Sequence, residues 1–461
     1  MAAPANILLI HSDQHRYDCI GANGHPFVRT PNLDRMSREG LRFTHAFTPV
    51  PLCTPARNCL LYGCWPHQHL AICNYDTEAP RGARPELISF SELLAAAGYN
   101  LGYVGKWHAN AARQPPEYGF KTWIDEADYD AWRKAQGLPP RPAANGWFGE
   151  TDPFVTGGQT RLGWGADRVI DALQRIARGK QPFFLRWDPS EPHLPNRVPA
   201  PYDRMYPLEQ IPPWPGFADP LDNKPYIQRK QQRTWGVEGW GWEKWSPIVQ
   251  RYLGEITLLD EQLGRILAAL GQLGLAEDTL VIYTSDHGDM CGSHGMMDKH
   301  YIMYDDVVRV PLLARWPRQV PAGATCGAFV SSALDLARTF LDLAGVPAPA
   351  SFVGQSLAPA LRGGKGPDRA AVVSTYYGNQ LGLFTQRMIR DLRWKYVWNA
   401  TAEDELYDLE SDPGEIRNRA AEPGVAAVLG RLRRGLLAWM EAERDPILNP
   451  WTRRQLGEAP R

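Results

Sequence analysis

A cysteine at the start of a short motif is the first residue of this sequence whose position suggests chemistry. Cys53, Thr54, Pro55, Ala56 and Arg57 form the pattern Cys-x-Pro-x-Arg, which reads as a turn that runs into a helix. The first turn of a helix presents free backbone N–H groups and the positive end of the helix dipole, and both favour an anion. The motif therefore predicts an anion site beside Cys53 that suits sulfate or phosphate.

Two pairs of polar residues have the composition of a site for a divalent cation. Asp13 and Gln14 follow one apolar run, and Asp286 and His287 follow another. Oxygen ligands with one imidazole suit such a cation, which would polarise a bound anion and lower the pKa of a coordinated hydroxyl. Taken singly, Asp13 could cap a helix and His287 could be a core histidine. Their pairing favours a metal site, with the predicted ligands Asp13, Gln14, Cys53, Asp286 and His287.

Three further segments carry cationic side chains and imidazoles. They are Gly105-Lys106-Trp107-His108, Glu191-Pro192-His193, and Lys299 within a stretch rich in histidine and aspartate. An anion needs fixed cationic donors, and ester hydrolysis needs groups that move protons at the nucleophile and at the leaving group. These segments offer such groups in Lys106, His108, His193 and Lys299, in addition to Cys53 and Arg57 of the first motif.

The polar segments follow runs that predict buried strands. These runs are residues 7–10, 99–104, 183–187 and 280–284, and they alternate with helical patterns. One predicted helix starts at Ser89, which has capping-box spacing to Glu92, and another starts near Pro247. The alternation predicts an α/β sheet that carries helices on both faces. Such sheets collect ligands at the carboxyl ends of their strands, where the polar segments lie.

The composition changes twice along the chain. Residues 192–247 are rich in proline and tryptophan, so we interpret them as an excursion from the sheet, either a packed surface cover or an aromatic wall of the pocket. After about residue 364, short predicted strands precede a helix from about Pro423 to Ala442. We therefore predict a catalytic α/β domain over residues 1–364 and a smaller α+β domain over residues 365–461.

The overall composition excludes several classes of protein. The chain has 461 residues, of which 44% are hydrophobic and 22% charged, and its formal net charge is −1. These values are typical of a globular protein, and without a basic block the chain does not attract nucleic acid. We find no signal-peptide pattern and no apolar stretch of the roughly 20 residues that span a bilayer. We expect no membrane partner and a cytoplasmic location.

The cysteines show neither the spacing of zinc ligands nor a secretory context. There are seven: Cys19, Cys53, Cys59, Cys64, Cys73, Cys291 and Cys326. Free cysteine is commonly buried as a small apolar residue. We expect six of them to be reduced structural thiols, with Cys53 as the exception.

Together, the motifs resemble those of the sulfatase family of the alkaline phosphatase superfamily. The pattern at 53–57 is similar to the site where a formylglycine-generating enzyme oxidises the family's cysteine, and the Gly-Lys-Trp-His segment at 105–108 is similar to a family signature. The resemblance extends from about residue 5 to about residue 420. It implies a large, mixed, mainly parallel sheet between helices, followed by a smaller α+β domain.

The resemblance also implies a role for each candidate residue. Hydrated formylglycine at position 53 would attack sulfur while Arg57, Lys106 and Lys299 hold the sulfate oxygens. His108 would deprotonate the second hydroxyl of the hydrate, and His193 and Lys299 would protonate the departing alcohol. The expected substrate is the sulfate ester of a carbohydrate, an aryl alcohol or an alkyl alcohol.

Three positions differ from the family pattern. Sulfatases often have a second acid where this chain has Gln14, and asparagine where it has His287, so two anionic metal ligands remain instead of three. Calcium is the family's usual ion and our first expectation, with manganese or magnesium as alternatives. Asp298 stands where glycine commonly precedes the lysine, and it either raises the pKa of Lys299 or faces solvent.

Two other functions remain open. A phosphonate monoester or phosphodiester hydrolase of the same superfamily is similar in Gln14, Ala56 and His287, but those hydrolases lack the lysine and histidine of the Gly-Lys-Trp-His segment. A catalytically silent binding protein with the sulfatase fold would lose at least one charged site residue, whereas this sequence keeps them all.

Overall fold

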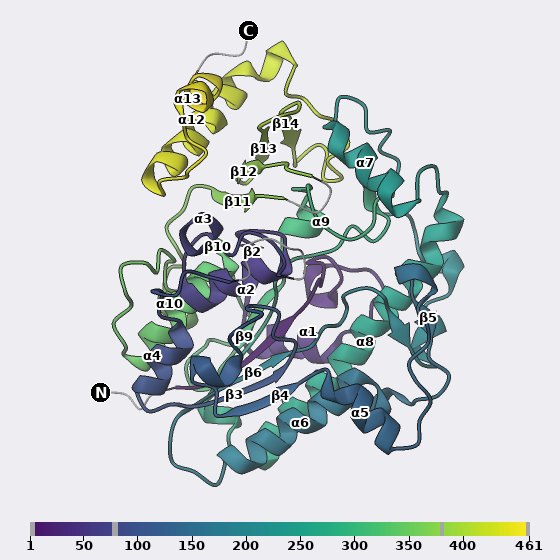
Figure 1. Ribbon diagram of the computed structural model, residues 1–461, viewed down its shortest axis with the longest axis vertical. Helices are drawn as coiled ribbons and strands as arrows, with labels where there is room; N and C mark the ends of the chain where they lie inside the picture. The colour runs from purple at the N-terminus through teal and green to yellow at the C-terminus, as the bar shows by residue number, and fades with distance from the viewer. Residues whose placement is uncertain (1–4, 76–81, 379–381, 458–461) are drawn as a thin grey trace.

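The centre of the molecule is an eight-stranded sheet in the order β10-β2-β9-β8-β1-β6-β3-β4. The computed structural model describes residues 5–75, 82–378 and 382–457 (Figure 1). Within these ranges only β9 runs antiparallel to its neighbours in this sheet, β2 and β8. The strands are β1 (Asn6–Ser12), β2 (Leu41–Phe47), β3 (Asn100–Gly105), β4 (Thr122–Asp125), β6 (Phe183–Asp188), β8 (Thr279–Ser285), β9 (Leu312–Arg315) and β10 (Ala324–Ser331). The predicted mixed, mainly parallel sheet is confirmed.

Helices cover both faces of this sheet, which is why its central strands are almost wholly apolar. Side chains alternate along a strand, so Leu8 and Ile10 of β1 enter one apolar cluster while Ile7 and Leu9 enter another. The helices α1 (Pro31–Glu39), α6 (Arg161–Ile176) and α8 (Trp242–Gln272) supply the first cluster. The helices α2 (Cys53–Tyr62), α4 (Phe90–Ala96) and α10 (Ser332–Ala344) supply the second.

One predicted helix start is confirmed and the other is wrong. Ser89 caps α4, because its hydroxyl accepts from the Glu92 N–H at 3.2 Å and the Glu92 carboxylate accepts from the Ser89 N–H at 2.9 Å. Helix α8 begins at Trp242, so Pro247 lies inside it and not at its start. The helical turn that precedes Pro247 is stabilised because it buries Trp245 completely within an apolar cluster rich in aromatic side chains.

The proline- and tryptophan-rich segment lies outside the central sheet, as predicted. It contains the helix α7 (Tyr226–Trp235), which its weak periodicity did not predict, and β7 (Arg197–Val198), which pairs with β5 (Glu150–Thr151). Its aromatic rings pack on one another, with the ring centres of Trp240 and Trp245 5.4 Å apart. For Trp240 and Trp245 the structure therefore favours the first interpretation, a packed surface cover, over an aromatic wall of the pocket.

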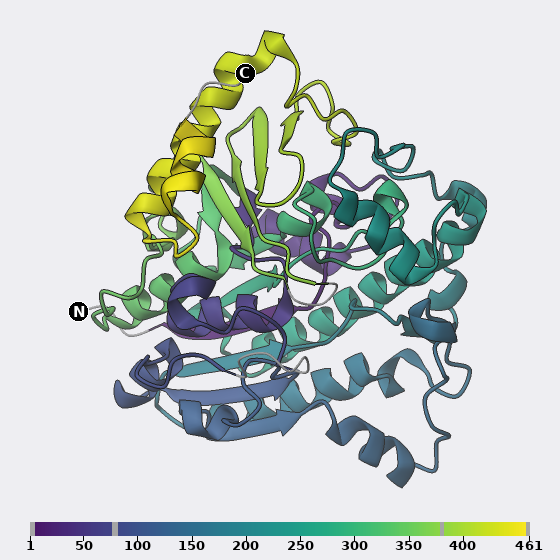
Figure 2. The ribbon, with the colours of Figure 1, turned by 45° about the horizontal axis from the view of Figure 1, so that its top comes forward.

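The carboxy-terminal region forms a second, antiparallel sheet with a helix along it (Figure 2). Its strands are β11 (Val372–Tyr376), β12 (Gln386–Arg390), β13 (Trp394–Asn399) and β14 (Glu405–Asp408), and α12 (Ala426–Ala442) packs on β12 and β13. The other α-helices of the described residues are α3 (Pro66–His69), α5 (Asp128–Ala135), α9 (Asp305–Val308), α11 (Ala358–Leu361) and α13 (Pro450–Gly457). The predicted α+β character of this region is confirmed.

The seven cysteines are free thiols, and all but Cys326 are buried. Among the described residues, no helix combines the length and the apolar character that crossing a membrane requires. Residues 1–4, which begin the amino-terminal segment without a signal-peptide pattern, lie outside the described part of the chain.

Candidate active site

Four adjacent strands deliver the predicted polar segments to one edge of the central sheet. They are β8, β1, β6 and β3, in that order. Ser12 at the end of β1 is level with Ser285 at the end of β8, and Gly105 at the end of β3 is level with Asp188 at the end of β6. Because parallel strands end at the same edge, the segments that follow them emerge side by side.

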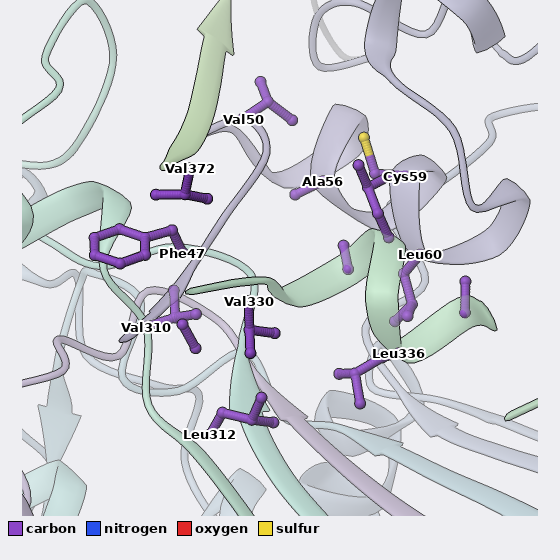
Figure 3. Packing of buried hydrophobic residues seen from close by; sticks show 14 of the residues in the cluster. Phe47, Val50, Ala56, Cys59, Leu60, Val310, Leu312, Val330, Leu336 and Val372 are labelled. Atoms are coloured by element: carbon purple, nitrogen blue, oxygen red, sulfur yellow. The ribbon is translucent and has the colours of Figure 1, made fainter. Parts of the chain in front are cut away.

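Cys53 is held at this edge as the first residue of α2. Every residue of the helix is buried, and Leu60 shares one apolar cluster with Leu336 of α10 (Figure 3). Cys53 itself is 1% exposed. The packing of the helix therefore places its thiol within the site and not on the surface.

Four of the five predicted cation ligands come together around this thiol, and the side chain of the fifth, Gln14, is bonded to Asp289, Asp298 and Lys299. Cys53, Asp13, Asp286 and His287 each offer one ligand atom, and these atoms all lie within 4.8 Å of one another. His287 Nε2 is 3.2 Å from Cys53 Sγ and 3.7 Å from Asp13 Oδ1. Burial lowers the pKa of His287, but its interactions with Asp286 and Cys53 prevail and raise it to about 9. Negative charge that draws a proton onto a buried imidazole is charge that a cation would neutralise, so the group fits a divalent metal.

Arg57 is the positive centre of the same buried group. Its Nη2 donates to Asp13 Oδ2 at 2.9 Å and lies 3.2 Å from Asp286 Oδ2, and its Nη1 donates to Asp188 Oδ2 at 2.5 Å. Burial lowers the pKa of Arg57, but these carboxylates raise it well above its usual value. A permanent, immobile cation therefore lies one helical turn from Cys53, where an oxyanion would need it.

The Gly-Lys-Trp-His segment turns sharply after β3. Gly105 has a φ of +107°, and a Cβ on it would lie 2.2 Å from the carbonyl oxygen of Asp188, so only glycine fits. The turn directs Lys106 toward the cation ligands, where its Nζ donates to Asp13 Oδ2 at 2.6 Å.

His108 lies beside this lysine with its ring partly buried. Its carbonyl oxygen accepts from the Thr54 hydroxyl at 2.9 Å, which ties the segment to the first turn of α2. Its buried Nδ1 has no hydrogen-bond partner among the described residues. Burial, and then the charge of Lys106, hold the pKa of His108 well below its usual value. The imidazole is therefore neutral and able to accept a proton.

Lys299 and His193 form a hydrogen-bonded pair. Lys299 Nζ donates to His193 Nε2 at 2.6 Å and to Gln14 Oε1 at 2.8 Å, and it lies 3.1 Å from Asp298 Oδ1. His193 Nδ1 is bonded to the carbonyl oxygen of Leu194, which suits a neutral ring that accepts at Nε2. Burial and Lys299 lower the pKa of His193. Burial also lowers the pKa of Lys299, but Asp298, together with Cys53 and Asp13, prevails and raises it. The proton of the hydrogen bond between Lys299 and His193 therefore stays on the lysine.

The comparisons with known proteins agree with this geometry. A family model described as Sulfatase matches residues 5–346, which is most of the chain. The chain belongs to the sulfatase family. A second model, described as N-sulphoglucosamine sulphohydrolase, C-terminal, matches residues 292–442. Since that match crosses residue 364, the division of the chain into domains at that point remains our proposal.

Relatives of the family are similar over almost the whole chain. The uncharacterized sulfatase YidJ of Escherichia coli is 29% identical over 482 residues, which covers 97% of this chain and 90% of that protein. The multifunctional alkaline phosphatase superfamily protein PehA of Trinickia caryophylli is 30% identical over 509 residues and 96% of each chain. The phosphonate monoester hydrolase of Agrobacterium radiobacter has a TM-score of 0.83 at 28% identity, over 95% of this chain and 96% of that one. This protein is thus a sulfatase-family hydrolase with a buried Asp/Cys/Asp/His site.

Asp298, where the family commonly has glycine, does not face solvent. It is 6% exposed and has a φ of +69°, the left-handed conformation that glycine adopts at least cost. Its carboxylate offsets this strain by accepting from Gln14 Nε2 at 3.0 Å and contacting Lys299, and it also lies 3.1 Å from His300 Nε2. Of the two alternatives for Asp298, the structure therefore favours an effect on the lysine.

Three buried residues of this sulfatase-family site were not predicted from the sequence. Asp188 holds Arg57, Asp289 accepts from Gln14 Nε2 at 2.8 Å, and Gln231 of α7 donates to the carbonyl oxygen of Lys299 at 2.7 Å. Asp188 ends β6 and Asp289 lies in the polar segment after β8, and these positions were the available signal. Gln231 has no such signal, because it reaches the site from the proline- and tryptophan-rich segment.

Proposed function

We propose that this protein is a sulfatase that hydrolyses the sulfate ester of a sugar, aryl or alkyl alcohol. Its nucleophile would be formylglycine, made from Cys53 by a formylglycine-generating enzyme, and its cofactor would be one divalent cation. The observation that carries the proposal is that three cations and two neutral imidazoles converge on the edge where Cys53 lies. These residues are Arg57, Lys106, Lys299, His108 and His193.

The cation would be held by Asp13, Gln14, residue 53, Asp286 and His287. When bound, it would polarise the sulfate and lower the pKa of the nucleophilic hydroxyl. Calcium is the first candidate, and manganese or magnesium are the alternatives that the imidazole and the neutral amide favour. Removal of the ion with a chelator, followed by addition of each ion in turn, would identify the one that restores turnover.

The chain's own residues account for binding and proton transfer. Arg57, Lys106 and Lys299 would hold the sulfate oxygens, since all three are charged and kept in place by buried partners. A hydrated aldehyde at position 53 supplies one hydroxyl for attack and a second whose loss of a proton releases sulfate. His108 would remove that proton, because its low pKa keeps the ring neutral.

The leaving group would receive its proton from the pair that His193 forms with Lys299. The raised pKa of Lys299 keeps it protonated at neutral pH, and its Nζ is 2.6 Å from His193 Nε2. The lysine can therefore act as the acid, while His193, whose Nδ1 is hydrogen-bonded to the Leu194 carbonyl oxygen, holds the ammonium group in place. An alcohol is a poor leaving group without such a proton donor.

A second candidate is a phosphonate monoester or phosphodiester hydrolase. Gln14, Ala56 and His287 favour it, and so does the TM-score of 0.83 to a phosphonate monoester hydrolase. Lys106 and His108 favour the sulfatase, because the resemblance places uncharged hydroxyl residues there in phosphonate hydrolases. A silent binding protein is the least supported function, since every charged site residue is present.

The decisive experiment is mass spectrometry of the peptide that contains Cys53, on protein coexpressed with a formylglycine-generating enzyme, combined with two ester assays. We expect conversion of the thiol to the aldehyde, and a higher kcat/KM for 4-nitrophenyl sulfate than for a phenyl phosphonate ester. The reverse order of kcat/KM would establish the second candidate. An unmodified thiol with no turnover of either ester would overturn the catalytic proposal.

A further inference from the structure

The side-chain amide of Gln14 has a complete set of hydrogen-bond partners. Its Nε2 donates to Asp289 Oδ2 at 2.8 Å and to Asp298 Oδ1 at 3.0 Å, and its Oε1 accepts from Lys299 Nζ at 2.8 Å. The four residues are at most 6% exposed. The backbone N–H of Gln14 donates to Asp286 Oδ1 at 3.1 Å, which ties this residue to one of the proposed cation ligands.

These partners permit only one orientation of the amide. A carboxylate can only accept hydrogen bonds, and an ammonium can only donate them. Rotation of the amide by half a turn would place its oxygen against Asp289 and Asp298 and its NH2 group against Lys299. Every hydrogen bond of the buried group would then be lost, at the full cost of leaving polar groups unpaired.

We propose that Asp289, assisted by Asp298, is a positioning residue that fixes Gln14 with its amide oxygen, and not its nitrogen, directed to the catalytic side. This inference rests on the proposed function, because the oxygen is what would make Gln14 a ligand of the cation. An amide nitrogen has no lone pair to offer a metal. A reversed Gln14 would therefore remove one ligand and present N–H groups to the cation.

The proposal also explains how a neutral glutamine can stand where the family often has an acid. The negative charge that such an acid would carry lies instead on Asp289 and Asp298, the residues that accept hydrogen bonds from Gln14. A carboxylate at position 14 would lie against those two carboxylates in a buried space. None of the three could donate a hydrogen bond to another, and their negative charges would repel. The glutamine and these two acids therefore belong together as one arrangement.

Asp289 is itself held rigidly, as its proposed task requires. Its Oδ1 accepts from the Cys291 N–H at 2.9 Å, and its backbone N–H donates to the carbonyl oxygen of Asp306 at 3.1 Å. Its own carbonyl oxygen accepts from Arg16 Nη1 at 2.8 Å. With backbone and carboxylate both anchored, Asp289 can set the orientation of its flexible partner.

The test measures cation affinity by titration calorimetry with Mn²⁺ and with Ca²⁺, on metal-free protein that retains the unmodified Cys53. We expect Asp289→Asn to weaken binding about 10–100-fold, the range typical of residues that orient a metal ligand. In the Gln14→Leu background the same substitution should have no further effect, because the amide through which Asp289 acts is gone. Thermal unfolding of each metal-free variant reports whether the fold is intact.

Asp260→Asn is the matched control. Asp260 is likewise buried and accepts from an amide side chain, Asn32 Nδ2 at 3.0 Å, but it lies on α8 away from the cation ligands. We expect this variant to change thermal stability and to leave cation affinity as it is. If Asp289→Asn does not unfold cooperatively, Asp298→Asn takes its place in the same cycle.

Two outcomes would overturn the assignment while leaving the proposed cofactor intact. The first is a cation affinity that does not change in Asp289→Asn. The second is an Asp289→Asn substitution that weakens cation binding equally in the unchanged protein and in the Gln14→Leu background. Absence of cation binding by the unchanged protein would contradict the proposed cofactor itself, and the positioning role would fall with it. Neither sulfate turnover nor maturation of Cys53 enters the measurement, so the two failures can be told apart.

Discussion

Two groups of buried charges lie in different parts of this molecule, and they are completed to different degrees. In the carboxy-terminal region, Arg387 donates through Nε and Nη2 to the two carboxylate oxygens of Asp445, and its Nη1 donates to backbone carbonyls. At the catalytic edge, the Nε of Arg57 and the Nδ1 of His108 are buried without a hydrogen bond in the described part of the chain.

The difference separates charges that hold the fold together from charges that are kept for a ligand. A buried ion pair with every polar atom satisfied joins two segments and has nothing left to offer a substrate. Buried polar atoms without partners are costly, and at a catalytic edge a bound group can complete them. We therefore expect substitutions at the catalytic edge to reduce turnover, and substitutions in the carboxy-terminal pair to reduce stability.

The largest effect is expected from Cys53→Ala. Loss of the nucleophile should lower kcat for 4-nitrophenyl sulfate by at least about 10⁴-fold, while the melting temperature stays close to that of the unchanged protein. Cys59→Ala, one helical turn and a half further along the buried α2, is the matched control and should remain active. Turnover that survives in Cys53→Ala would contradict the proposed nucleophile.

A comparison of two histidines sharpens the distinction between the regions. His108→Ala should reduce kcat by about 10²–10⁴-fold, because it removes the proposed base. His67 also has a lowered pKa, but its nitrogens are bonded to the Tyr377 hydroxyl at 2.9 Å and to the Glu443 carbonyl oxygen at 2.9 Å. His67→Ala should lower the melting temperature and leave kcat per folded molecule unchanged. Equal losses of kcat in both variants would show that the distinction does not hold.

Arg387→Met should destabilise the protein by about 3–5 kcal/mol, since it leaves Asp445 buried without its partner. The free energy of unfolding from denaturant titration measures this effect, and kcat/KM of the folded fraction should not change. Arg387→Met combined with Asp445→Leu should recover part of the stability, because no charge is then left unpaired. A loss of turnover without a loss of stability would assign this pair to the catalytic machinery.

The smallest expected effect is a displacement of the pH profile. His108 must be neutral to act as a base, and its pKa is held well below 6.5, so its neutral form persists as the pH falls through 6.5. The acid limb of kcat should therefore have its midpoint below pH 6.5. The raised pKa of Lys299 keeps that lysine protonated on the alkaline side. An acid limb centred at or above pH 6.5 would contradict the role of His108.

Much of the fold and of the candidate site follows from local sequence. The apolar runs near residues 7–10, 99–104, 183–187 and 280–284 are central strands, because a sheet that is buried on both faces selects continuous apolar segments. The polar segments after them meet at one edge, because parallel strands end together. The motif from Cys53 to Arg57 could also be recognised from the sequence, because its residues are close along the chain.

What the sequence determined by itself was thus the strands, the motifs and the edge at which they meet. Only the tertiary structure decided which polar groups are bonded to one another. Gln14 and Asp289 are 275 residues apart, and Gln231 reaches the Lys299 loop from a segment outside the sheet. Asp298 adopts a left-handed conformation that its residue type disfavours. Such partnerships depend on distances and angles between distant segments, and these exist only once packing has brought the segments together.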